Sequence, residues 1–83
     1  MDTTQQVVQV LASVLNLGAR ANQLKRESPL LGALAELDSI SVVATLTALE
    51  VRFGITIEDD DIDGQTFATL GNLVTFVDGK LTQ

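Results

Sequence analysis

The sequence predicts an all-α protein, a small up-down four-helix bundle of three long helices and one short helix, in a single domain over residues 1–83. Three segments carry apolar residues every three or four positions, a spacing that places them along one side of a helix. A hydroxyl or carboxylate side chain precedes each segment and glycine follows two of them, as is typical of helix starts and ends. A chain of 83 residues has the size of one small domain.

The first helix is predicted from about Thr3 to Leu17, with Gly18 ending it. Its apolar positions have the spacing of a core-facing stripe and are Val7, Leu11, Val14 and Leu15. A long connection from Gly18 to Leu37 follows, in which Pro29 disfavours helix at the residue before it. Four leucines of this connection are expected to pack into the core: Leu30, Leu31, Leu34 and Leu37.

The second helix is predicted from Asp38 and Ser39 to about Phe53, with Gly54 ending it. The residues predicted to face the core recur every three or four positions and are Ile40, Val43, Leu46, Leu49 and Phe53. The residues predicted to face outward are small or neutral and include Ser41, Ala44, Thr45, Thr47, Ala48 and Val51. After Asp38, Glu50 and Arg52 are the only charged residues of this helix.

Two short elements are predicted between the second helix and the last helix. Residues 55–57 form an extended piece too brief to build a sheet, and residues 58–62 form one helical turn. Thr66 is predicted to cap the last helix, from about Phe67 to Lys80. Gly71 weakens that helix by about 1 kcal/mol relative to alanine, so we expect close packing against a neighbouring helix there.

The composition excludes several classes of function. The chain has no cysteine and no histidine, so it lacks a thiol nucleophile, thiolate ligands and the commonest general base. The net charge of −6 argues against binding to nucleic acid or to anionic membranes. No apolar segment approaches the roughly 20 residues of a membrane span, and the first residues do not resemble a secretory signal. We therefore expect a monomeric, cytoplasmic protein that is not an enzyme.

Ser39 is the residue that points to a function. Its hydroxyl is predicted to lie at the start of the second helix, where backbone N–H groups and the helix dipole favour a phosphate. An Asp-Ser pair alone is a common helix cap. The other serines are less suited, because Ser13 lies within a helix, Ser28 precedes proline, and Ser41 has no aspartate before it.

The chain resembles the acyl carrier protein family from about Val7 to Leu81. The resemblance rests first on Leu37-Asp38-Ser39-Ile40, which is similar to the Asp-Ser-Leu attachment motif, with isoleucine in place of the usual leucine. Residues 48–55 are similar to the end of the family's second helix and the loop after it. Residues 57–62 and 66–73 look like the third and fourth helices.

The resemblance implies that a phosphopantetheinyl transferase attaches 4′-phosphopantetheine covalently to Ser39, and that the arm's thiol carries acyl groups as thioesters between acyl-loading and acyl-transferring enzymes. Asp38 is then the residue expected to contact the transferase and the cofactor. Leu37 and Ile40 are expected to form a hydrophobic rim around the arm. Because the family can hold a fatty acyl chain between its helices, the candidate pocket walls are Val43, Leu46, Ile57 and Ile62.

The second helix departs from the family's pattern. Many fatty-acid carriers have a strongly acidic second helix, whereas this one has Ser41, Ala44, Val51 and Arg52 at the matching places. This difference favours a specialised lipid, polyketide or exopolysaccharide-associated pathway and a more apolar docking face. The run from Leu30 to Ser39 is similar to stand-alone carriers linked to exopolysaccharide and protein-sorting gene clusters.

The sequence also leaves two other functions open and contains part of one metal-binding motif. A peptidyl carrier would carry an aminoacyl group, although Asp38 before the serine favours the acyl type. An unmodified helical interaction module would keep the fold and never receive the arm. Asp59, Asp61, Asp63 and Gly64 match the first half of a calcium-binding EF-hand loop. Because Leu70 stands where that loop needs a bidentate glutamate, we expect no specific metal site.

Overall fold

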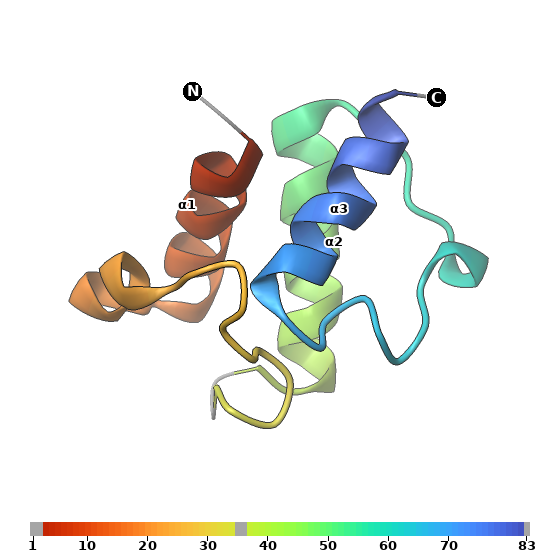
Figure 1. Ribbon diagram of the computed structural model, residues 1–83. Coiled ribbons are helices and arrows are strands. Elements are labelled where there is room, and N and C mark those ends of the chain that lie inside the picture. The colour runs from red at the N-terminus through yellow and green to blue at the C-terminus, as the bar shows by residue number, and fades with distance from the viewer. Residues whose placement is uncertain (1–2, 35–36, 83) are drawn as a thin grey trace.

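The computed structural model describes residues 3–34 and 37–82. Three α-helices, α1 (Thr3–Leu15), α2 (Ser39–Phe53) and α3 (Leu70–Leu81), form the bundle, with two 3₁₀-helices between them, η1 (Gly18–Gln23) and η2 (Asp59–Asp61). In Figure 1 α1 runs opposite to α2 and α3, which run in the same direction because the segment with η2 returns the chain to the same end. Helix α1 packs against both of the others. The all-α bundle of three long helices and a short one is confirmed.

The core of the described residues is aliphatic with one aromatic ring. It contains residues from all three α-helices and from the first long connection: Val7, Val10, Leu11, Leu15, Leu17, Ala21, Leu30, Leu37, Leu49, Phe67, Leu70, Leu73, Val74 and Val77. The prediction for the leucines of the connection holds for Leu30 and Leu37, which are buried, and in part for Leu34, which is half-buried. It is wrong for Leu31, which is 51% exposed.

Helix α1 is two residues shorter than predicted. It ends at Leu15 because Asn16 takes a left-handed backbone conformation, with φ of 59°. The chain then turns into η1, which the sequence did not predict and which buries Ala21. Helical periodicity gives no signal for so short a 3₁₀ segment.

Helix α2 has the predicted limits but a different buried side. Asp38 caps its start and Gly54, with φ of 65°, ends it. Two members of the predicted core stripe, Ile40 and Val43, are exposed, whereas Thr45, predicted to face outward, is fully buried. The helix is apolar around much of its circumference, so its periodicity did not define the side that α1 would cover.

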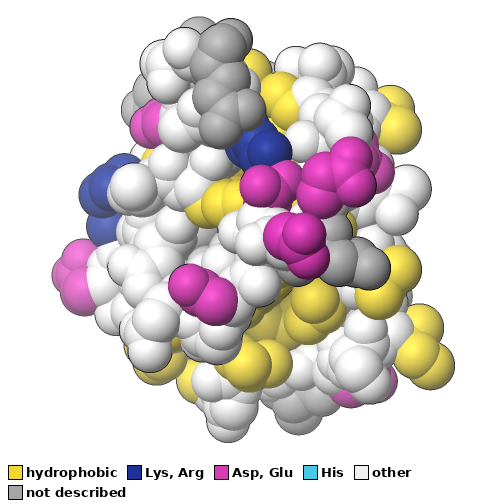
Figure 2. All heavy atoms as spheres, turned by 90° about the vertical axis from the view of Figure 1, so that its right-hand side faces the viewer, with side chains coloured by type: hydrophobic (Ala, Val, Ile, Leu, Met, Phe, Trp, Pro, Cys, Tyr) yellow, Lys and Arg dark blue, Asp and Glu magenta, His cyan; other side chains and the backbone are white. Residues whose placement is uncertain are grey.

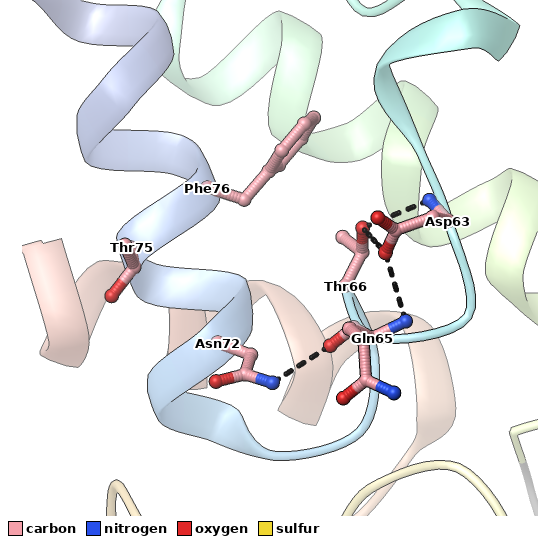
Figure 3. Close-up of a pocket in the computed structure, with 6 residues that line it drawn as sticks. All are labelled: Asp63, Gln65, Thr66, Asn72, Thr75 and Phe76. Carbon is pink, nitrogen blue, oxygen red and sulfur yellow. Dashed lines mark hydrogen bonds between the residues drawn. The ribbon is translucent and has the colours of Figure 1, made fainter.

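Helix α3 starts three residues later than predicted. The Oγ1 atom of Thr69 accepts a hydrogen bond from the backbone N–H of Asn72 at 3.1 Å and caps the helix. Thr66 has another role, because its hydroxyl lies against Asp63, as Figure 3 shows. The residues before Thr69 form turns and are bonded to the first connection, in which Leu31 N–H donates to Phe67 O at 2.9 Å.

Gly71 packs closely against backbone, as predicted, but its neighbour is the first connection and not a helix. Its N–H donates to the Arg26 carbonyl at 2.7 Å. A Cβ atom added at Gly71 would lie 2.9 Å from that same oxygen, whereas one added at Gly79 would meet nothing within 4 Å.

The two glycines of α3 therefore provide a matched pair. Gly71→Ala is expected to destabilise the protein by about 1 kcal/mol, because overpacking of about 1–3 kcal/mol exceeds the gain in helix propensity. Gly79→Ala is expected to stabilise it by about 0.5–1 kcal/mol. Urea denaturation measures both changes, and equal effects of the two substitutions would contradict this packing.

No helix within the described ranges is both long enough and apolar enough to cross a lipid bilayer.

Candidate functional site

Ser39 is the first residue of α2, and its side chain is exposed. Asp38, just before it, is also exposed, and its Oδ1 accepts a hydrogen bond from the Ser41 N–H at 2.8 Å. The Asp38 carbonyl accepts the Val42 N–H, also at 2.8 Å, which closes the first turn. The Ser39 hydroxyl thus lies at the positive end of a 15-residue helix, an environment that favours a negatively charged substituent.

The four predicted site residues do not all share one surface. Asp38, Ser39 and Ile40 are exposed together at the start of α2. Leu37 is buried in the core and contributes almost no exposed surface. The expected hydrophobic rim is therefore corrected: Ile40 presents the apolar side chain beside Ser39, and Leu37 instead fixes the chain just before the helix.

The pKa of Asp38 is lowered, mainly because the backbone N–H of Ser41 donates to its carboxylate and secondarily because the Ser41 hydroxyl does so. A carboxyl whose pKa is lower in the folded state stabilises the fold above its unfolded pKa. That contribution is lost as the pH falls through the lowered value.

This arrangement predicts a pH dependence that one substitution removes. In Asp38→Asn the cap remains, since asparagine caps helices as well as aspartate does, but nothing at this position titrates. The wild type should lose stability relative to Asp38→Asn on acidification below the ordinary aspartate pKa. Thermal unfolding of both proteins over that range tests this, and parallel curves would contradict the lowered pKa.

The two charged residues of α2 are engaged within the molecule. The Glu50 Oε2 atom accepts the backbone N–H of Ile57 at 2.8 Å and so holds the segment after the helix. The Arg52 guanidinium donates to the side-chain oxygens of Gln6 and Gln9 on α1. Both charges therefore connect elements of the fold.

A groove of about 550 Å³ lies between α1 and α2. Its lining is mainly apolar and consists of Gln9, Val10, Ser13, Val14, Ala44, Thr47, Ala48, Val51 and Arg52. None of the predicted pocket walls lines it. Val43 is exposed, Leu46 and Ile57 are half-buried against the core, and Ile62 is half-buried. Sequence reasoning missed this groove because its two walls come from helices far apart in the chain.

The acidic segment, residues 58–61 around η2, is organised by contacts within the protein. Asp61 Oδ2 accepts from Lys80 Nζ at 2.5 Å and from the Glu58 N–H at 2.9 Å, and the Lys80 bond lowers the pKa of Asp61. Figure 2 shows acidic side chains gathered on this side of the molecule. In residues 3–34 and 37–82 no group of three or more carboxylates could hold a metal ion.

A smaller cavity of about 280 Å³ lies beside the start of α3 (Figure 3). Its polar groups contact one another: Asp63 Oδ1 accepts the Gln65 N–H at 2.8 Å, and the Asn72 amide donates to the Gln65 carbonyl at 2.9 Å. These bonds fix the turn before the helix. The alternative serines have no comparable setting. Ser13 is exposed but lies within α1, the Ser28 hydroxyl accepts the Lys25 N–H at 2.8 Å, and Ser41 is half-buried.

Comparisons with known proteins indicate the family of the chain. The family model described as "phosphopantetheine attachment site" matches residues 5–77. The solution NMR structure of a holo acyl carrier protein from Nitrosomonas europaea is similar over 100% of both chains, with 47% sequence identity and a TM-score of 0.92. The comparison with curated proteins found no match.

Proposed function

Since the chain belongs to the acyl carrier protein family, whose members bear a covalent 4′-phosphopantetheine arm, we propose that Ser39 is the residue to which the arm is attached. The observation that carries this proposal is the exposed hydroxyl at the first position of α2, directly after the Asp38 cap. A phosphodiester there would lie at the positive end of the helix dipole.

The chemistry of attachment requires little of this chain beyond an accessible hydroxyl. The Ser39 oxygen loses its proton and bonds to phosphorus of coenzyme A, while the nucleotide part of coenzyme A leaves. A carrier of this family does not catalyse the reaction, so the transferase supplies the base and any metal. Asp38 lies next to Ser39 on the surface and is the residue we assign to transferase contact.

The arm supplies a thiol, which holds acyl groups as thioesters. The chain has no cysteine, so its own residues cannot provide that sulfur. Ile40, exposed beside Ser39, offers an apolar surface to the first atoms of the arm. Partners are the transferase and enzymes that load, modify and unload the acyl group.

The proposal also includes the pathway, the oligomeric state and the cellular compartment. The absence of free acidic side chains on α2 favours a specialised lipid, polyketide or exopolysaccharide-associated pathway. We further propose that residues 1–83 act as one monomeric carrier domain in the cytoplasm.

Intact-mass spectrometry tests the proposal. The purified protein is incubated with coenzyme A and a broad-specificity phosphopantetheinyl transferase. The mass should increase by one phosphopantetheine group, and subsequent treatment with a thiol-specific reagent should label the product but not the starting protein. A folded protein that gains no mass would contradict the carrier function and favour the unmodified interaction module.

A further inference from the structure

The exposed side of α2 carries no charge between Ser39 and Val51. Its residues, here called the α2 face, are Ile40, Val43, Ala44, Thr47 and Val51. Ile40 and Val51 are each 81% exposed and Val43 is 63% exposed. Large exposed aliphatic side chains gathered on one helix face are typical of an interaction surface.

The charged residues of α2 lie outside the α2 face, although Arg52 also lines the groove beside it. Glu50 is half-buried with its carboxylate on the Ile57 N–H, and Arg52 donates to two glutamines of α1. The acidic segment is not part of the α2 face. Its Asp61 forms an ion pair with Lys80 of α3. A partner approaching the α2 face beyond Ser39 therefore meets methyl and hydroxyl groups. The exposed Asp38 carboxylate lies only at the start of the helix, where it accepts the Ser41 N–H.

The groove between α1 and α2 continues the α2 face sideways. Ala44, Thr47 and Val51 belong both to the face and to the groove wall, while Val10 and Val14 form the opposite wall. The surface is thus a ridge beside a hollow, a shape into which an apolar side chain of a partner can insert.

Any enzyme that reacts at Ser39 must cover the start of α2, because Ser39 is its first residue. We propose that the transferase that loads the arm docks along the α2 face and the adjoining groove with an apolar, uncharged surface. This inference rests on the proposed function of Ser39. Beyond the contact with Asp38, it assigns the binding of the partner to apolar contact and not to attraction between acidic and basic side chains.

Val51 is the residue on which to test this. It lies twelve residues from Ser39, about 18 Å along the helix, so it is too far away to touch the reacting atoms. Because its side chain is exposed, substitutions there should keep the fold, which thermal unfolding verifies.

The loading rate is measured by mass spectrometry for the wild type and for Val51→Glu, Val51→Lys and Val51→Thr. Both charged variants should lower kcat/KM by about tenfold or more, mainly through KM, because either charge is desolvated at an apolar interface. Val51→Thr, of the same shape and uncharged, should lose only about twofold to fivefold, as expected for one apolar contact of up to about 1 kcal/mol.

Two controls separate apolar from electrostatic docking. The wild-type rate should change little between about 0.1 and about 1 M NaCl, a range over which the Debye length falls from about 10 to about 3 Å. Asp60→Asn, in the exposed acidic segment, should load like the wild type.

Several results would overturn the inference. These are charged Val51 variants that load like the wild type, a Glu variant that loads faster while the Lys variant loads more slowly, or strong inhibition by salt. In each case the wild type still gains its arm, so the failure concerns docking alone. A wild type that gains no mass at all would instead contradict the proposed function.

Discussion

Ser39→Ala is expected to abolish the mass gain completely and to leave the fold unchanged. The oxygen that bonds to phosphorus is removed, and no other described serine combines exposure with a helix start. Asp38, which makes the cap through its own side chain, is retained. Circular dichroism and thermal unfolding should therefore match those of the wild type.

Ser41→Ala is the matched control for this experiment. Ser41 lies two residues further into the same turn, is half-buried and donates its N–H to Asp38. The backbone N–H remains in the alanine variant, so loading should persist. Mass gain in Ser39→Ala would contradict the assignment of the arm to Ser39. Loss of loading in Ser41→Ala with the fold intact would contradict it as well, because the reacting hydroxyl would then be that of Ser41.

Thr45→Val is expected to stabilise the protein by about 1–2 kcal/mol. Thr45 is fully buried in α2, and its Oγ1 has no hydrogen-bond partner within the described part of the chain. A buried hydroxyl without a partner costs about 1–3 kcal/mol in proteins, and valine places a methyl group in nearly the same space. Chemical denaturation measures the change.

Thr47→Val provides the comparison, because Thr47 lies on the exposed side of the same helix. The same chemical change at an exposed position should alter stability by less than about 0.5 kcal/mol. If Thr45→Val destabilised the protein, the hydroxyl would have to be engaged by a buried water or another group. Equal effects at the two positions would show that burial does not decide the outcome.

The limits of α2 could be predicted from the sequence because both of its end signals are local. Asp38 accepts a hydrogen bond from three residues further on, and Gly54 takes a left-handed conformation that glycine adopts without strain. The position of Ser39 at the helix start follows from the same signals. The site could therefore be recognised without knowing how the helices pack.

The start of α3 could not be predicted in this way. Thr66 and Thr69 are both suitable caps, and the choice between them depends on a contact far away in the chain. The segment from Arg26 to Leu31 pairs with residues before and at the start of α3, through bonds such as Leu70 N–H to the Ser28 carbonyl at 3.0 Å. Periodicity within the last segment carries no information about that partner.

The side of α2 that faces the core could not be predicted from the sequence pattern either. Apolar residues occur on most of its sides, so Ile40 and Val43 fitted a core stripe as well as Val42 and Leu49 did. Packing against α1 buries Leu49 and Thr45 and leaves the α2 face exposed. This orientation of α2 about its own axis also places Ala44, Thr47 and Val51 along the groove. It explains why the predicted pocket walls lie elsewhere.

The most direct test of the account is to locate the arm on the chain. The loaded protein is digested with a protease, and tandem mass spectrometry of the fragment that contains residues 37–41 identifies the modified residue. We predict a phosphopantetheine group on Ser39, with its fragment ions assigning the added mass to that side chain alone. The same group on any other serine or threonine, with Ser39 unmodified, would contradict the central claim.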